Sequence, residues 1–349
     1  MPHWFGMKQY FFFVSLVLCS LVSEAQLGGN STYSFLNMPI AARPSALGGT
    51  NVSVRDSDLN MVDQNPSLLD SNMDRHASLN YINYVADINY GYMAYARKLK
   101  KHGMFSAGMQ FLDYGKFTRA DQTGLRSGEF RAGDYALLLT HARPIDSLFS
   151  VGGTFKTIYS NLDSYNSFGM AVDLSGSYLS KNKRFSAGLV IRNLGIQLKS
   201  YVAGNRENLP LQINLGISQR LSKAPIRVSL QAVNLQRWDL TYESSVDDDD
   251  GGSNGGSSSA FSLDNAMRHV VMGVELLPSN NFHLRLGYNY QRRQELKIAN
   301  RAALSGISFG LGFKIGRYHL SYALGRYHLA GTSNHITIST NLSQRRSRG

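Results

Sequence analysis

Cysteine is nearly missing from this chain of 349 residues, and the single one is Cys19. It lies in a mostly apolar stretch, Phe11 to Val22, that follows a basic residue and precedes the small residue Ala25. This order is typical of a cleaved export signal, so residues 1–25 are predicted to be a signal peptide. Lipidation of Cys19 would require a small residue before it, where Leu18 stands. The mature chain is therefore expected to have no disulfide and no thiol chemistry.

Long apolar runs are missing as well. No segment after residue 25 has the roughly 18 consecutive apolar residues by which a transmembrane helix is recognised. Proline is scarce, with eight residues, whereas 33 glycines and 19 tyrosines recur in short alternating runs. Such runs favour β structure over helix.

Alternation with a period of two continues through the chain after residue 74. Apolar residues alternate with polar or small ones over 211–218, 282–290 and 307–315. Successive side chains of a strand point to opposite faces, so each segment has one apolar face and one polar or small face. Strands are predicted near 75–86, 88–99, 103–114, 130–143, 148–160, 165–180, 184–198, 210–221, 226–237, 267–278, 281–292, 304–315, 317–327 and 335–342.

Alternation alone also fits a soluble β-sandwich, and the connections separate the two folds. With both termini periplasmic, the even-numbered connections are short and the odd-numbered ones include long segments. This asymmetry and an even strand number are typical of bacterial outer-membrane barrels. The sequence therefore predicts an all-β fold, a transmembrane antiparallel up-and-down β-barrel of about 14 strands over 75–343. It would lie in the outer membrane of a diderm bacterium with its long loops extracellular. The long connections are 115–129, 199–209, 238–266, 293–303 and 328–334.

Three segments lie outside this pattern. Residues 26–74 lack alternation and are predicted to be either a plug folded into the lumen or a periplasmic tail. Two motifs stand out in this segment, Leu47-Gly48-Gly49 and Asn65-Pro66. Residues 244–259 combine an acidic run with a Gly/Ser tract and predict a flexible extracellular loop. Residues 344–349 form a basic C-terminal tail.

The net charge of +12 raises the question of nucleic-acid binding. Export separates the chain from nucleic acid, and the basic residues are scattered, so no nucleic-acid partner is expected. Scattered lysines and arginines suit the rims of a barrel bordered by outer-membrane lipid and lipopolysaccharide, whose headgroups are anionic. Solvated loop charges are the simpler interpretation of any single basic residue.

No catalytic, cofactor or metal site is predicted. The nine histidines form no zinc-binding pattern. The run from Asp247 to Asp250 lacks the spaced ligands of a calcium loop, so a solvated acidic loop is favoured over a calcium site. A histidine near hydroxyl and amide groups occurs around Ser333, Asn334 and His335, which leaves an enzyme as an alternative.

Several longer motifs follow one another along nearly the whole mature chain. They are Gly-Gly-Asn-Ser-Thr-Tyr-Ser-Phe-Leu (28–36), Ser-Ala-Leu-Gly-Gly-Thr-Asn-Val-Ser-Val-Arg-Asp (45–56), Gln-Asn-Pro-Ser-Leu-Leu (64–69), Ser-Leu-Asn-Tyr-Ile-Asn-Tyr (78–84), Asp-Ser-Leu-Phe-Ser-Val-Gly (146–152) and Leu-Gln-Arg-Trp-Asp-Leu-Thr-Tyr (235–242). As a set they resemble the PorQ family of the type IX secretion system. The Ala-Leu-Gly-Gly and Asn-Pro-Ser elements are shared with the wider FadL-like outer-membrane β-barrel superfamily.

The resemblance implies a non-catalytic anchor in the outer membrane. PorQ-type barrels hold the surface protein PorZ in an attachment complex with PorU and PorV, which processes secreted cargo and links it to lipopolysaccharide. The implied partners are thus a PorZ-like protein and, indirectly, PorU and PorV. Candidate contact residues on the outer loops are Phe117, Arg119, Tyr201, Arg206, Trp238, Tyr242, Arg292 and Arg293.

Two alternatives stay open for these assignments. Trp238 and Tyr242 equally fit a belt at the membrane interface, where aromatic rings with a polar tip collect. The chain as a whole could instead be a FadL-like channel for a hydrophobic solute. The lumen faces predicted from alternation are rich in Gly, Ser, Asn and charged residues, which argues against an apolar channel.

Overall fold

The structure is a computed structural model that describes residues 31–84, 88–100, 102–120, 125–241, 262–296, 305–328 and 331–343. The predicted signal peptide, the acidic Gly/Ser loop, the basic tail and Tyr242 lie outside the described residues. Among the described residues, no helix is long and apolar enough to cross a membrane.

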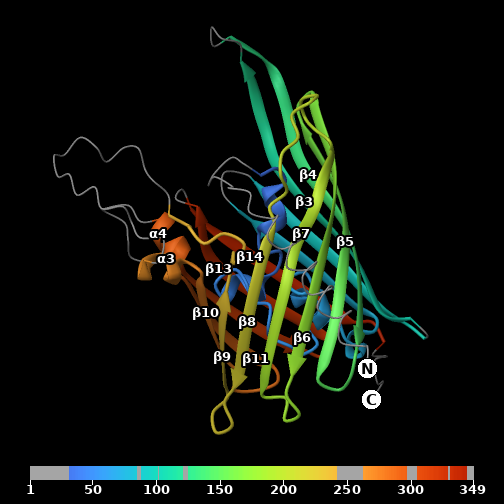
Figure 1. Ribbon diagram of the computed structural model, residues 1–349, viewed down its shortest axis with the longest axis vertical. Coiled ribbons are helices and arrows are strands. Elements are labelled where there is room, and N and C mark those ends of the chain that lie inside the picture. Colours follow the sequence, from blue (N-terminus) through green and yellow to red (C-terminus); the bar gives the residue numbers. More distant parts are fainter. Residues whose placement is uncertain are drawn as a thin grey trace, which may run out of the picture. The chain divides into compact units, whose positions relative to one another are not determined.

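Fourteen antiparallel strands form one closed barrel, in which each strand pairs with its neighbours in sequence and β1 pairs with β14 (Figure 1). The strands are β1 (His76–Asn83), β2 (Asn89–Leu99), β3 (Gly103–Ala120), β4 (Arg126–Pro144), β5 (Phe149–Leu162), β6 (Tyr165–Leu179), β7 (Phe185–Lys199), β8 (Gln212–Arg220), β9 (Ile226–Ala232), β10 (Val270–Leu276), β11 (Phe282–Asn289), β12 (Ile307–Ile315), β13 (Tyr318–His328) and β14 (Gly331–Asn341). The predicted fourteen-stranded up-and-down barrel is confirmed.

The period-two pattern decides which side chains face outward. In β12, Phe309 and Phe313 are 42% and 45% exposed, whereas Ser308 is 2% exposed on the opposite face. Large apolar side chains occupy the outward positions of the other strands in the same way, as Leu137 of β4 and Leu189 of β7 illustrate. An outward apolar band on a barrel without free edges is what a bilayer requires, because lipid offers no hydrogen-bond partner to an unpaired strand.

The two ends of the barrel differ in their connections. The short-turn end has the connections 100–102, 145–148, 180–184, 221–225, 277–281 and 316–317. The long-loop end has the connections 84–88, 121–125, 163–164, 200–211, 233–269, 290–306 and 329–330. Two short helices lie at the long-loop end, α3 (Leu263–Arg268) and α4 (Tyr290–Glu295).

Several strand ends differ from the prediction. The connection expected over 115–129 is largely strand, because β3 continues to Ala120 and β4 begins at Arg126, with register shifts after Asp113 and Arg119. The strand expected over 281–292 ends at Asn289, whose side chain accepts a hydrogen bond from the Arg292 N–H and so begins α4.

A charge on the outward face should destabilise the barrel strongly at mid-strand and weakly at a loop. We expect Leu137→Arg, near the middle of β4, to lower the free energy of unfolding by about 2–4 kcal/mol, and Val202→Arg, in the connection 200–211, by at most about 1 kcal/mol. Reversible urea unfolding in lipid vesicles measures both values. Equal effects at the two positions would mean that the outward face does not contact hydrocarbon.

Candidate functional site

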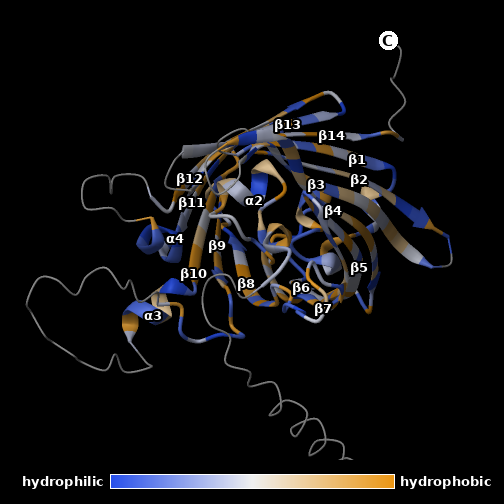
Figure 2. Cartoon of the chain, turned by 90° about the horizontal axis from the view of Figure 1, so that it is seen from above, coloured by the Kyte–Doolittle hydropathy of each residue, from blue (hydrophilic) through white to orange (hydrophobic). Residues whose placement is uncertain are grey.

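Residues 31–75, here called the lumen segment, lie inside the ring of strands, where α2 (Ala42–Ala46) is seen when the barrel is viewed from above (Figure 2). The segment also forms the 3-10 turns η1 (Ser34–Asn37), η2 (Leu59–Met61), η3 (Pro66–Leu68) and η4 (Ser71–Met73). Most of its side chains between Thr32 and Leu69 are buried. The described residues of this segment therefore pack in the lumen and do not extend outside the barrel as a tail.

Polar side chains shape the lumen segment locally. Asp58, Asn65 and Asp70 each precede a 3-10 turn and accept a hydrogen bond from the backbone N–H two residues ahead, at 2.9–3.0 Å. These residues compete well for local backbone donors, which explains why the segment makes short turns instead of a strand. The Asn65 amide also donates to the Val52 carbonyl oxygen at 2.7 Å and ties two stretches of the segment together.

Glycines let the lumen segment approach the barrel wall closely. Gly48 and Gly49 have φ values of 95° and 98°, a region that other residues rarely adopt. A Cβ atom on Gly287 of β11 would lie 2.1 Å from the Gly48 nitrogen, and one on Gly188 of β7 would lie 2.0 Å from the Val52 carbonyl oxygen. The Leu47 side chain lies over Gly273 of β10 in the same manner. The wall is therefore shaped to hold this segment.

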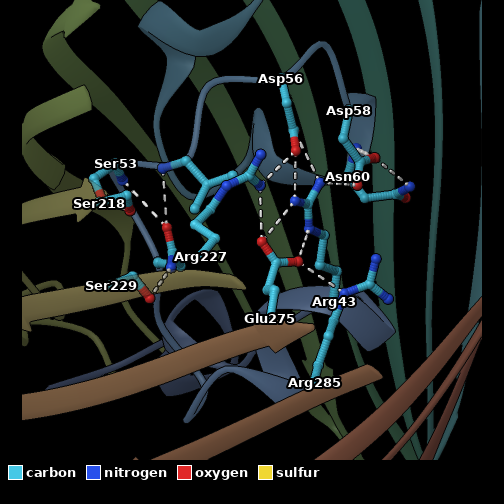
Figure 3. Close-up of polar contacts among 12 residues, drawn as sticks. Arg43, Ser53, Asp56, Asp58, Asn60, Ser218, Arg227, Ser229, Glu275 and Arg285 are labelled. Atoms are coloured by element: carbon cyan, nitrogen blue, oxygen red, sulfur yellow. Dashed lines mark hydrogen bonds and ion pairs between the residues drawn. The ribbon is translucent and has the colours of Figure 1, made fainter. Parts of the chain in front are cut away.

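An ion cluster joins the lumen segment to three adjacent strands (Figure 3). Arg43 of α2 donates to Asp56 at 2.7 and 2.9 Å, to Asp58 at 2.9 Å and to Glu275 of β10 at 3.0 Å. Arg227 of β9 donates to Asp56 at 2.7 Å and to Glu275 at 2.8 Å. A third arginine, Arg285 of β11, donates to Glu275 at 3.0 Å. Three guanidinium groups thus face three carboxylates, and their charges balance.

The charges of this cluster hold one another in their ionised forms. Burial would raise the pKa of Asp56, but Arg43 and Arg227 lower it well below its usual range. Burial would lower the pKa of Arg43, but Asp56, Glu275 and Asp58 raise it far above its usual value. An aspartate with a lowered pKa contributes stability above its unfolded pKa, about 3.9, and loses it only as the pH falls toward the folded value. The contribution of Asp56 to docking of the lumen segment is therefore expected to be constant above about pH 4 and to be lost below it.

Further buried contacts hold the lumen segment against other strands of the barrel wall. Arg192 of β7 donates to Asp63 and to the Leu36 carbonyl oxygen, both at 3.2 Å. An apolar cluster lies beside this pair and combines side chains of the segment with those of the strands. Its members include Tyr33, Phe35, Leu36, Ile40, Leu59, Val62, Leu69, Met73, Ile82, Tyr90, Tyr92, Leu112, Leu138 and Ile158. Apolar packing thus fills this part of the lumen beside the buried pair of Arg192 and Asp63.

The hydroxyl–histidine group around His335 is enclosed. His335 Nδ1 lies 3.0 Å from the Ser45 hydroxyl, and Nε2 lies 3.1 Å from the Ser333 hydroxyl. Ser333 and His335 are 0% and 1% exposed beneath the lumen segment, so no substrate reaches them. Within the described ranges, no group of three or more His, Asp or Glu side chains is placed to hold a metal ion.

The candidate contact residues at the long-loop end are dispersed over separate loops. Trp238 is 42% exposed and stacks on His269, with ring centroids 5.4 Å apart. Phe117 stacks on Phe130 along the β3–β4 hairpin at 5.2 Å. Arg119 forms an ion pair with Asp163. Arg206 and Arg293 are exposed.

Two of the candidate residues are engaged within the barrel. The Tyr201 hydroxyl donates to the Ser160 hydroxyl oxygen at 2.5 Å. The Arg292 guanidinium lies 3.9 Å from the centre of the Tyr327 ring and donates to the Gly48 carbonyl oxygen at 3.3 Å. These contacts give both side chains an internal role, since they hold a loop or helix against the wall and the lumen segment.

Sequence reasoning did not single out the ion cluster. Arg227, Glu275 and Arg285 occupy inward positions of adjacent strands, so their charges had to be balanced inside the barrel. The sequence does contain a signal for the ion cluster, because charged residues lie on the polar face of three strands and the lumen segment is rich in Asp and Arg. Which of these charges pair with one another follows only from the strand register.

Comparisons with known proteins agree with this architecture. No family model matches the sequence, and no curated protein matches it. The toluene transporter TbuX of Ralstonia pickettii has the same fold with a TM-score of 0.52 and 13% identity, covering 88% of this chain and 99% of that chain. A deletion mutant of the monoaromatic hydrocarbon channel TodX matches with a TM-score of 0.50 and 11% identity, covering 86% of this chain and 99% of that one.

The chain has the fold of FadL-like outer-membrane barrels. At these identities the likeness concerns the fold alone. The narrower resemblance to PorQ proteins rests on the sequence motifs.

Removing one carboxylate from the ion cluster should loosen the lumen segment. Glu275→Gln leaves three arginines facing two carboxylates, and breaking a buried pair costs about 3–5 kcal/mol. We expect faster proteolysis within residues 31–75 and a lower free energy of unfolding. Glu129→Gln breaks an exposed ion pair with Lys116 and should cost less than about 1 kcal/mol. Equal stability of the two variants would contradict a structural role of the cluster.

Proposed function

We propose that this chain is a non-catalytic outer-membrane anchor that docks a surface protein through its long-loop end. The observation that carries this proposal is the filled lumen, in which buried ion pairs and apolar packing hold the lumen segment as a plug. A conduit needs a path for its solute or a plug that moves. Moving this plug would separate Arg43 from Glu275 and Arg192 from Asp63, and breaking one such buried pair costs about 3–5 kcal/mol.

The long-loop end offers a preorganised platform. The Tyr290 hydroxyl of α4 donates to Asp264 of α3 at 2.6 Å, and Arg268 donates to the same carboxylate at 2.8 Å. Leu263 at the start of α3 is 80% exposed, and Trp238 lies close by, since its carbonyl oxygen accepts from the Asn265 amide at 2.7 Å. Exposed apolar anchors on a braced surface favour protein binding, because little order is lost on association.

The identity of the partner follows from the PorQ resemblance. The anchor would place a PorZ-like protein at the cell surface, within a type IX attachment complex that also contains PorU and PorV. Both termini would then be periplasmic and the long loops extracellular. Exposed basic residues at the long-loop end, Arg206 and Arg293 among them, suit contacts with anionic lipopolysaccharide.

A second candidate function is a conduit for a hydrophobic solute. The observation in its favour is the fold shared with a toluene transporter and a monoaromatic hydrocarbon channel. The polar side chains that line much of the lumen, such as Asn214, Ser218 and Gln231, oppose it, because they are buried in hydrogen bonds to the protein that an apolar solute could not replace.

Two substitutions at the platform test the anchor. Trp238→Ala with Leu263→Ser should reduce recovery of the PorZ-like protein on the affinity-tagged barrel roughly thirtyfold, because buried aromatic anchors contribute about 2 kcal/mol or more. Ile145→Ser, an exposed apolar residue at the short-turn end, is the matched control and should leave recovery unchanged.

Deletion of the gene separates the two candidate functions. For an anchor, secreted cargo in the deletion strain should keep its C-terminal signal and lose its attachment to the surface, and vesicles carrying the pure protein should take up toluene no faster than protein-free vesicles. Correctly processed cargo in the deletion strain, together with toluene uptake faster than in protein-free vesicles, would exclude the anchor and establish the conduit.

A further inference from the structure

A cavity of about 470 Å³ lies at the short-turn end of the barrel, beside the ion cluster. One wall is the lumen segment, with Asp56, Asp58 and Asn60. The other walls are the ends of β1, β8, β9 and β11–β14 with two of the short turns. A volume of this size is in the range of small-molecule sites.

The cavity carries an excess of positive charge. The arginines of the ion cluster, Arg43, Arg227 and Arg285, are matched by its three carboxylates. Three further cations line the same space, namely Arg220, Lys314 and Arg317, together with His76, His283 and His319. Within the described ranges, no ion pair joins any of these six to a carboxylate. The Arg317 guanidinium donates to the hydroxyl of the outward Tyr318 at 2.9 Å, so Arg220 and Lys314 make the local charge about two units positive even with neutral histidines.

The strands, and not only the turns, direct these groups inward. In β12, Lys314 shares the inward face with Gly312 and Gly310, between the outward Phe313 and Ile315. Arg220 continues the inward row of β8 after Ser218. Cations gathered in one cavity repel each other, and a bound anion would relieve this repulsion.

We propose that this cavity binds a small phosphoryl anion. Arginine presents a planar fork of donors that matches phosphate oxygens, and lysine adds a point charge. Neutral donors complete the lining, including the hydroxyls of Ser321 and Ser339. The same phosphoryl chemistry is found on soluble phosphate esters and on lipid headgroups. The lining favours the soluble source, because its only large aliphatic and aromatic members are Leu59, Leu277 and Phe313.

Calorimetric titration with inorganic pyrophosphate tests the site, using the full barrel in a neutral detergent at low salt. We expect saturable binding of one anion per barrel. Arg220→Gln with Lys314→Gln should weaken it at least roughly tenfold, since hydrogen bonds to charged groups contribute about that factor or more. Lys314→Gln alone should show a smaller loss. Among the residues that the structure describes, neither Arg220 nor Lys314 has an ion-pair partner, and native migration of the unheated barrel on a gel verifies folding.

The matched control is Lys181→Gln with Arg184→Gln. These two exposed cations lie in the connection 180–184 at the same end of the barrel, but outside the cavity. Their removal should leave pyrophosphate binding unchanged. Equal loss in control and cavity variants, or no saturable binding by the folded wild-type barrel, would overturn the proposal.

A second arm distinguishes the sources of the phosphoryl group. The titration is repeated in nanodiscs of neutral phosphatidylcholine and in nanodiscs that also contain phosphatidylglycerol. A soluble ligand predicts the same pyrophosphate affinity in both. A lower affinity with phosphatidylglycerol, absent from the cavity variant, would assign the same site to a lipid headgroup.

Discussion

Backbone pairing between β1 and β14 is the interaction on which the rest of the structure depends. The ladder from His76 and Asn341 to Asn83 and Asn334 closes the sheet, so no strand edge has to be satisfied by lipid. Closure also separates two environments. Each strand then has one face toward hydrocarbon and one toward the lumen. The apolar residues of each alternating segment face the hydrocarbon, and the polar or small residues face the lumen.

Inside the closed ring, charge pairing and shape act together. Gly188 and Gly287 leave room for the backbone of the lumen segment, while Arg43 reaches Glu275 through two hydrogen bonds. A buried charge without a partner is costly, so the position of α2 is tied to the register of β9, β10 and β11. The lumen segment and the barrel therefore specify each other, because a shift of one residue in those strands would turn Glu275 toward lipid.

The filled lumen separates two ends with different chemistry. The long-loop end presents exposed apolar side chains on helices that brace each other, a surface suited to protein. The short-turn end encloses a polar cavity with more cations than carboxylates, a space suited to a small anion. A fold shared with hydrocarbon channels does not decide between such uses, because function depends on the groups placed within the barrel and at its ends.

The sequence by itself determined the number of strands, their inward and outward faces and the asymmetry of their connections, because a period of two is a local property of the chain. It did not reveal that β3 and β4 continue through 115–120 and 126–129, where pairing across the hairpin outweighs weak alternation. Only the tertiary structure decided that Arg43, Asp56 and Glu275 form one ion cluster. It also decided that the side chains of Tyr201 and Arg292 make contacts within the barrel. The physical reason is that these contacts join residues far apart in the chain, and their geometry exists only once the ladder closes around the lumen segment.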